Sequence, residues 1–323
     1  MKRMNKQIRT IFMGTPDFAV PGLKALIEAP DFEVIAVITQ PDKPVGRKHI
    51  LHAPPVKTVA LEAGIQVIQP EKIKTEIDHI AELKPDLVVV IAYGKIIPQA
   101  ILDIPQYGCI NVHASLLPRH RGASCLQAPI LKGESETGVT IMLMDAGLDT
   151  GPILRQEKIE LKGDETLTDL HDTLSELGAK ALIPTLSSYC EGGILPVPQD
   201  ETLASYIGLM TKENGRLTPM RTATELERRV RALNPWPGTY IELPNGEHIK
   251  VLKAEVDERD HKRAVGEIYT ENNELFLACR QNSLRILKLQ RENRNALDAS
   301  DFLKGATEII GQVVKSDTPL IQE

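Results

Sequence analysis

The sequence predicts an α/β fold with a Rossmann-like, mostly parallel sheet, followed by a smaller β-rich domain. Over residues 8–190, short apolar runs alternate with amphipathic stretches, which is the order that βαβ units require. A stretch rich in glycine, proline and acidic residues follows at 191–211 and has no apolar period. Beyond it, five short alternating runs separated by turn residues are typical of a small β-barrel, OB-like in character, or of a sandwich.

The first part of the chain is expected to contain seven strands. The central one is the apolar run 86–93, which suits a strand buried on both faces. Residues 40–57 are expected to be a long, basic, proline-rich loop without regular structure. The expected strands are 8–13, 32–39, 66–68, 86–93, 108–113, 138–144 and 153–161. Helices are expected over 53–63, 122–132 and 166–190. Two further helices are expected to end near residues 28 and 83, and a short one is expected to begin near residue 98.

The turn after the first strand, Gly14-Thr15-Pro16-Asp17, holds a single glycine. The G-x-G-x-x-G dinucleotide fingerprint is therefore absent, and we expect neither a nicotinamide nor a flavin site.

The second part of the chain is expected to begin with a basic helix at 222–233, stopped by the prolines of 234–238. The expected strands are 239–243, 249–256, 265–269, 275–278 and 284–289, and a short helix near 299–304 follows. We therefore predict domains at 1–190 and 212–323, joined by a linker at 191–211.

The composition is that of a globular protein rather than of a membrane or disulfide-stapled one. Hydrophobic residues make up 42% of the 323 residues, and no run is long enough to span a membrane. The four cysteines lack C-x-x-C spacing, and the apolar run near the N-terminus is too short for a secretion signal. His49 and His52 have no acidic or cysteine neighbours. We expect a cytoplasmic protein with reduced thiols and no metal site.

The charge distribution does not suggest a broadly basic protein. The net charge is −6, and residues 210–323 hold 18 basic and 18 acidic side chains. A contact with a polyanion would therefore have to use local clusters. The candidate clusters in the second domain are Arg228/Arg229/Arg231, Lys262/Arg263 and Arg285/Lys288/Arg291/Arg294, each of which could equally be a solvated face.

The candidate reaction centre is the stretch 108–122, GCINVHASLLPRHRG. Because side chains alternate along a strand, Asn111 and His113 are expected on one face, with Ile110 and Val112 on the other. An amide donor and a titratable base at the end of a buried strand are typical of a reaction centre. A satisfied polar pair would give the same pattern.

Asp149 strengthens the catalytic interpretation. It lies in the turn-rich loop 145–152 after the next strand, and ligands collect at the carboxyl ends of strands in open α/β sheets. A carboxylate beside an imidazole fixes its tautomer and raises its pKa, while an amide N–H can donate to an oxyanion. No G-x-S-x-G motif is present and Ser115 has no evident base, so we favour direct acyl transfer over a covalent acyl-enzyme.

These residues together resemble the formyltetrahydrofolate-dependent formyltransferases. The resemblance rests on Asn111-x-His113, Ser115-Leu-Leu-Pro118, Arg121-Gly122, and Asp149 placed 36 residues after the histidine. It covers nearly the whole chain through the further motifs GTPDF (14–18), QPDKPVGR (40–47), VVVIAYG (88–94), GVTIMLMDAGLDTG (138–151) and RALNPWPG (231–238).

The resemblance implies that the first domain is catalytic and that the second is a tRNA-binding barrel. The donor would be 10-formyltetrahydrofolate, and the acceptor the α-amino group of methionine on initiator methionyl-tRNA. Asn111 would donate to the formyl oxygen, His113 would assist that charge and shuttle protons, and Asp149 would orient and charge the histidine. No metal is implied, and a monomer is expected.

Binding residues are implied in the same way. Ser115, Leu116, Leu117 and Pro118 would line part of the folate site. Arg47 would contact the acceptor-stem region of the tRNA, with weaker contributions from Lys43 and Lys48.

Two departures from the family pattern and two alternatives stay open. After Gly122 the family usually has two alanines, proline and isoleucine, where this chain has Ala123-Ser-Cys-Leu126, and Lys48-His49-Ile50 is less basic than is usual. Relatives that formylate a glycinamide ribonucleotide or an amino-sugar nucleotide share Asn111, His113 and Asp149. A non-catalytic folate- or RNA-binding protein could also retain the fold.

Overall fold

The computed structural model describes residues 7–45 and 50–316, which form two compact units. Unit 1 comprises Met1–Cys125, Glu136–Glu160 and His171–Tyr206. Unit 2 comprises Leu126–Ser135, Leu161–Leu170 and Ile207–Glu323. Two short segments from the middle of the chain therefore belong to the same unit as the C-terminal residues.

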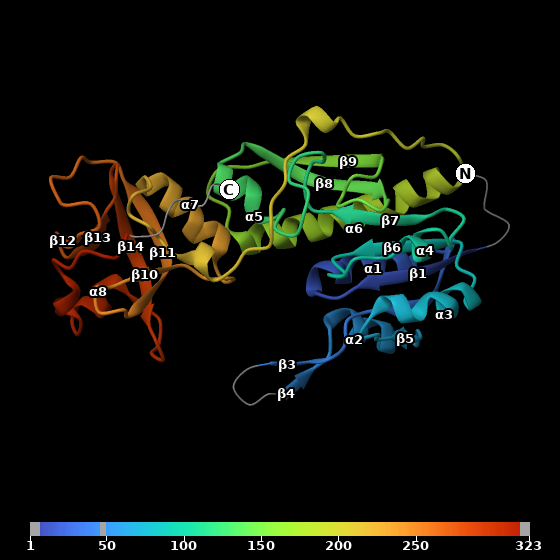
Figure 1. Ribbon diagram of the computed structural model, residues 1–323, viewed down its shortest axis with the longest axis horizontal. Helices are drawn as coiled ribbons and strands as arrows, with labels where there is room; N and C mark the ends of the chain where they lie inside the picture. The colour runs from blue at the N-terminus through green and yellow to red at the C-terminus, as the bar shows by residue number, and fades with distance from the viewer. Residues whose placement is uncertain (1–6, 46–49, 317–323) are drawn as a thin grey trace. The chain divides into compact units, whose positions relative to one another are not determined.

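Unit 1 is built on a seven-stranded sheet in the order β5-β2-β1-β6-β7-β8-β9 (Figure 1). Neighbouring strands from β5 to β7 are parallel, and β8 and β9 are antiparallel additions at one edge. The prediction of a mostly parallel sheet is confirmed. The strands are β1 (Ile8–Gly14), β2 (Phe32–Ile38), β5 (Val67–Ile68), β6 (Leu87–Ile91), β7 (Cys109–His113), β8 (Glu136–Leu143) and β9 (Ile153–Glu160).

Helices pack on both faces of this sheet. One face carries α1 (Val20–Glu28) and α6 (Leu167–Cys190): a Cβ on Gly22 would lie 2.4 Å from Ile91 Cδ1, and one on Gly178 would lie 2.9 Å from Val112 Cγ1. A Cβ at either position would force the neighbouring side chain to shift, so glycine allows the closer approach. The other face is a cluster of buried side chains to which α3 (Ile77–Glu82) and α4 (Gln99–Leu102) contribute Ile80 and Ile101. The helix α2 (Pro55–Glu62) follows β4.

The prediction that residues 40–57 lack regular structure is wrong. An antiparallel pair forms between β3 (Lys43–Val45) and β4 (Ile50–His52), with Lys43 opposite His52 (Figure 1). Pairing gives the backbone of this segment hydrogen-bond partners that a plain loop would have to find in water. Because the segment carries proline and charged residues, its sequence lacks the apolar alternation by which a strand is predicted.

The expected helix at 122–132 is shorter than predicted. In the structure α5 covers only Gln127–Lys132. Pro129 is the reason: it lacks a backbone N–H and is tolerated only in the first turn of a helix. A helix that began at Gly122 would have placed this proline in its interior.

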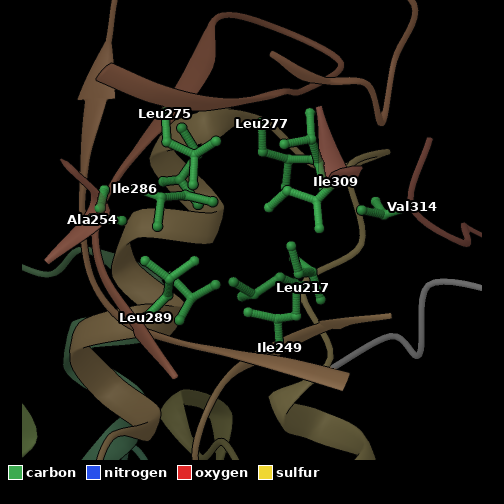
Figure 2. Close-up of a cluster of buried hydrophobic side chains, with 14 of the residues drawn as sticks. Leu217, Ile249, Ala254, Leu275, Leu277, Ile286, Leu289, Ile309 and Val314 are labelled. Atoms are coloured by element: carbon green, nitrogen blue, oxygen red, sulfur yellow. The ribbon is translucent and has the colours of Figure 1, made fainter. Parts of the chain in front are cut away.

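Unit 2 is an antiparallel sheet in the order β10-β11-β14-β13-β12, which follows α7 in the chain. Most of its buried side chains form one hydrophobic core that includes Leu217, Ile249 and Leu289 (Figure 2), and Tyr269, Phe276 and Ala278 form a second, smaller cluster. A two-residue strand, β15, pairs with β14 and was too short to be predicted. The elements are α7 (Ala223–Leu233), β10 (Tyr240–Glu242), β11 (His248–Asp257), β12 (Ile268–Glu271), β13 (Glu274–Ala278), β14 (Ser283–Arg291), β15 (Leu297–Asp298) and α8 (Ala299–Leu303).

Candidate active site

Asn111 and His113 lie on β7, between the last parallel neighbour β6 and the antiparallel β8. Asn111 is paired with Val90 on one side and with Met142 on the other, and His113 is paired with Thr140. The two side chains are two residues apart and therefore share one face of the strand. The backbone of both residues is fixed by the sheet, so the side chains are held on a rigid element.

The Asn111 side chain is half-buried, and its carboxamide makes no hydrogen bond to any residue in the described ranges 7–45 and 50–316. A polar group in this position is normally paired with protein or water. The amide is therefore free to donate to an oxygen of a bound substrate.

His113 is 6% exposed, and both of its ring nitrogens face oxygen atoms. Nδ1 lies 3.6 Å from Oδ2 of Asp149, and Nε2 lies 3.1 Å from the carbonyl oxygen of His120. Burial by itself lowers the pKa of the imidazole, but the adjacent Cys125, Asp149 and the His120 carbonyl together raise this pKa to about 9. These neighbours therefore favour the imidazolium form of His113.

Cys125 belongs to the departure from the family pattern after Gly122. Its thiol interacts with the His113 ring and contributes to the raised pKa of that ring. The changed residues at 124–126 thus alter the immediate surroundings of the histidine as well as the local packing.

The backbone around Asp149 and His120 is strained. Asp149 has φ +55° and His120 has φ +59°, in the left-handed region that is uncommon for residues other than glycine, although asparagine, aspartate and histidine adopt it more often than the rest. Each such residue costs on the order of 1–3 kcal/mol and persists only where its surroundings enforce it. Here the Gly122 amide donates to Asp149 Oδ2 at 2.8 Å, which ties the two loops together.

The predicted folate segment, Ser115 to Pro118, is largely turned inward. Ser115 is fully buried and its hydroxyl donates to the Arg119 carbonyl at 2.8 Å. Leu116 and Leu117 are also buried, whereas Pro118 is half-buried. Their backbone is held by Thr140, whose Oγ1 accepts from Leu117 N at 3.0 Å and donates to Ser115 O at 2.7 Å.

Two hydroxyls at the carboxyl ends of parallel strands were missed by the sequence reasoning. Thr39 follows β2 and Tyr93 follows β6, and within the described part of the chain neither buried hydroxyl has a hydrogen-bond partner. Burial also raises the pKa of Tyr93 to about 12. The Tyr93 carbonyl meanwhile accepts from Thr15 and Gln40, so the loops after β1, β2 and β6 are joined. Unpaired polar atoms at this edge are compatible with a bound polar ligand. The only signal in the sequence was their position in or beside the family motifs.

The predicted RNA contacts are only partly described. Lys43 is exposed, and its ammonium group donates to Gln40 Oε1 at 2.7 Å. Arg47 and Lys48, together with His49, lie outside the described residues.

The basic clusters of unit 2 are largely engaged within the protein. Arg229 is 6% exposed and donates to the Asn214 carbonyl, and Arg231 pairs with Glu227. Arg285 pairs with Glu255 and Glu274, Arg291 with Glu247 and Glu308, and Arg263 with Glu267. These arginines do not form an open basic face.

Over the described ranges, no three His, Cys, Asp or Glu side chains are grouped so as to hold a metal ion. In the same part of the chain, none of the helices has the length and the apolar character that crossing a membrane requires.

Comparison with known proteins agrees with this geometry. Residues 6–186 match the formyl transferase family, and residues 209–307 match the formyl transferase C-terminal domain. A methionyl-tRNA formyltransferase from Caldanaerobacter subterraneus is 43% identical over 311 residues, covering 95% of this chain and 100% of that protein. One from Citrifermentans bemidjiense is 47% identical over 302 residues, covering 92% and 93%.

A solved structure is similar in fold. The N-formyltransferase from Helicobacter canadensis, in complex with folinic acid and dTDP-3-aminofucose, superimposes with a TM-score of 0.66. It is 19% identical in sequence, and the match covers 88% of this chain and 100% of that one. The family models cover most of the chain, and the relatives match it nearly from end to end. The chain therefore belongs to the formyl transferase family and, within it, groups with the methionyl-tRNA formyltransferases.

Proposed function

We propose that Asn111, His113 and Asp149 catalyse the transfer of a formyl group from 10-formyltetrahydrofolate to the α-amino group of methionine on initiator tRNA. The observation that carries the proposal is an unpaired amide two residues from a buried, charged histidine. The substrates follow from relatives, 43–47% identical, that are named methionyl-tRNA formyltransferase.

The chemistry assigns one task to each residue. The folate supplies the electrophilic formyl carbon, and the amine of methionine forms a new C–N bond to it. The Asn111 amide donates to the formyl oxygen as it gains negative charge, and the imidazolium adds an electrostatic contribution. His113 gives a proton to the folate nitrogen as its bond to the formyl carbon breaks, then takes one from the attacking amine, so its charge is restored. Asp149 keeps the ring charged.

Folate binding is assigned to the carboxyl edge of the parallel strands. The segment Ser115–Pro118 borders this edge, and since its first three side chains are buried, contact with the ligand falls to Pro118 and to the backbone. The unpaired hydroxyls of Thr39 and Tyr93 can supply hydrogen bonds to polar atoms of the ligand.

The tRNA is assigned to the β3–β4 segment, with Arg47 as the principal contact and Lys43 and Lys48 as weaker ones. Lys43 is exposed on β3, and a basic side chain on a two-stranded surface segment can reach phosphates without unfolding any core element. The proposed catalytic and tRNA-binding domains are 1–190 and 212–323, with 191–211 between them. We further propose a monomer and, because the relatives act in translation, a cytoplasmic location.

The test is a transfer assay that offers charged initiator tRNA, charged elongator tRNA and small amines in parallel, with 10-formyltetrahydrofolate as donor. We expect formylation of the initiator tRNA and little of the others. His113→Ala should lower kcat by roughly 10²–10⁴-fold while tRNA binding stays nearly unchanged. Preference for a small amine would overturn the acceptor, and near-normal turnover by the variant would overturn the role of His113.

A further inference from the structure

The segment 197–206, which we assigned from sequence to the linker, packs against the candidate active site. Val197 exchanges two backbone hydrogen bonds with Ile153, at 2.8 and 2.9 Å. Ser205 accepts from the Arg121 amide through its carbonyl at 2.8 Å and from the His120 amide through its hydroxyl at 3.0 Å. The segment is thus tied at one end to the start of β9, just after the Asp149 loop, and at the other to the loop that follows Pro118.

Gln199 lies between these two ends, and its carboxamide makes four hydrogen bonds. Nε2 donates to the carbonyl of Asp149 at 2.8 Å and to that of Gly151 at 2.7 Å. Oε1 accepts from Nε of Arg121 at 3.1 Å and from its Nη2 at 2.8 Å. A single side chain therefore connects the Asp149 loop to the loop that follows Pro118.

Arg121, which donates to Gln199, is itself held firmly in place. Its side chain is 0% exposed, and it forms a two-point contact with the Glu201 carboxylate at 2.7 and 2.9 Å. Its Nη1 also donates to the Tyr206 hydroxyl at 2.8 Å. A buried guanidinium with all these partners cannot shift without leaving a charge unpaired, which is strongly unfavourable.

We propose that Gln199 is a positioning residue for formyl transfer: its amide holds the Asp149 backbone so that the carboxylate faces His113. Asp149 needs such a restraint, because it occupies the left-handed region at φ +55°. Its Oδ2 lies 3.6 Å from His113 Nδ1, so a small movement of the loop would separate the two groups. The inference rests on the proposed roles of His113 and Asp149.

Two nearly isosteric variants distinguish the contact of Gln199 with the 149–151 loop from the contact of Glu201 with Arg121. Gln199→Glu keeps an acceptor for Arg121 but removes both donors to the 149–151 loop. Glu201→Gln removes the charge opposite Arg121 but leaves the Gln199 amide in place. Gln7→Leu is the matched control, because Gln7 is an exposed glutamine whose amide makes one bond to a backbone carbonyl, that of Pro30 at 2.9 Å.

The readouts are kcat and KM for both substrates, the pH dependence of kcat, and NMR titration of the His113 ring, assigned with His113→Asn. The groups that face this ring are Cys125, Asp149 and the His120 carbonyl. Moving the Asp149 carboxylate away removes one of the influences that raise the pKa of His113. The pKa should therefore fall, and the high-pH limb of kcat should move to lower pH.

We expect Gln199→Glu to lower kcat about tenfold to a hundredfold, the scale for misplacing a catalytic group by an ångström, with KM unchanged. Glu201→Gln should have a smaller effect, and Gln7→Leu none. Gln199→Met, which removes the same donors without adding charge, serves if the first variant does not fold. An unchanged kcat and an unchanged His113 titration in a folded Gln199 variant would overturn the inference. Activity that survives in His113→Ala would instead overturn the proposed function.

Discussion

His113 combines near-complete burial with a raised pKa. Burial opposes the imidazolium, yet Cys125, Asp149 and the His120 carbonyl surround the ring closely enough to raise its pKa to about 9. The charged form suits stabilisation of an oxyanion and donation of a proton to a leaving nitrogen. It also makes the stability of the protein depend on this residue.

That dependence has a definite sign. The folded-state pKa of His113, about 9, lies above the ordinary value of 6.5, so the folded state binds the proton more tightly than the unfolded state does. The stabilisation is complete below pH 6.5 and is lost as the pH rises through 9. It amounts to about 3 kcal/mol. Urea unfolding at pH 6.5 and 9.5 should give that difference for the native protein and a much smaller one for His113→Asn. If the free energy of unfolding changed equally between the two pH values in the native protein and in His113→Asn, the raised pKa of the ring would be contradicted.

Asp149→Asn tests the charge without changing the shape of the side chain. The asparagine can still accept from the Gly122 amide, but it no longer favours the imidazolium. We expect kcat to fall roughly 10²–10⁴-fold and the pKa of His113 to fall with it. Asp145→Asn is the control, because Asp145 is an exposed carboxylate of the same loop that accepts from Gly147 and Thr150. A similar loss in both variants would indicate a general disturbance of the loop.

The catalytic residues could be proposed from sequence, whereas their supports could not. Strand alternation places Asn111 and His113 on one face, and the family spacing identifies Asp149. Gln199 lies in a stretch without hydrophobic period, so nothing local distinguishes it from a linker residue. Its role appears only where residues about 50 positions apart, Asp149 and Gln199, are brought into hydrogen-bond contact.

Among the elements, the strands were predicted more accurately than the segments next to them. Continuous apolar runs locate β1, β6 and β7 because a strand buried on both faces needs no alternation. The β3–β4 pair was missed because its strands are three residues each and carry lysine, proline and histidine. The length of α5 depended on one proline, whose effect on a helix is local and was readable from the sequence.

The turn between α7 and β10 is held by Asn234, which opens the NPWPG motif. Its Nδ2 donates to Val230 O at 2.8 Å, Thr239 Oγ1 at 3.0 Å and Val251 O at 3.1 Å. Removing this side chain takes the Nδ2 donor away from Val230 O and Thr239 Oγ1, whereas Val251 O still accepts from the Thr239 hydroxyl at 2.6 Å.

Asn234→Ala should therefore destabilise unit 2 by about 1–3 kcal/mol. Calorimetry or denaturant unfolding followed by circular dichroism would measure the change. Asn245→Ala is the comparison, since Asn245 is an exposed turn residue whose side chain accepts only from the Glu247 amide. An equal effect of the two substitutions would contradict the role assigned to Asn234.

For the molecule as a whole, charge is the property that constrains RNA binding. The net charge is −6, and the arginines of unit 2 that we considered as patches are mostly engaged with acids or carbonyls. These engaged arginines are poorly placed to neutralise phosphates, so the proposed contact through the β3–β4 segment should contribute more to binding.

The affinity for initiator tRNA should fall as the salt concentration rises, because each neutralised phosphate releases counterions. Arg47→Ala should weaken binding and reduce the slope of log affinity against log salt by about one. Lys24→Ala, which removes an exposed lysine of α1, is the control and should leave the slope unchanged. Titration of labelled tRNA at several salt concentrations measures both. A flat response would argue against phosphate contacts, and an unchanged slope in Arg47→Ala would remove Arg47 from the interface.

The sequence by itself determined the fold class, the order of the main elements and the identity of the catalytic candidates. These follow from hydrophobic periodicity and from motifs that are contiguous in the chain. Tertiary structure alone decided that the pKa of His113 is raised, that Asp149 occupies the left-handed region, and that Gln199 and Arg121 join the Asp149 loop to the loop after Pro118. The reason is physical: burial, electrostatic neighbours and long-range hydrogen bonds depend on where distant segments meet, and no local pattern records that.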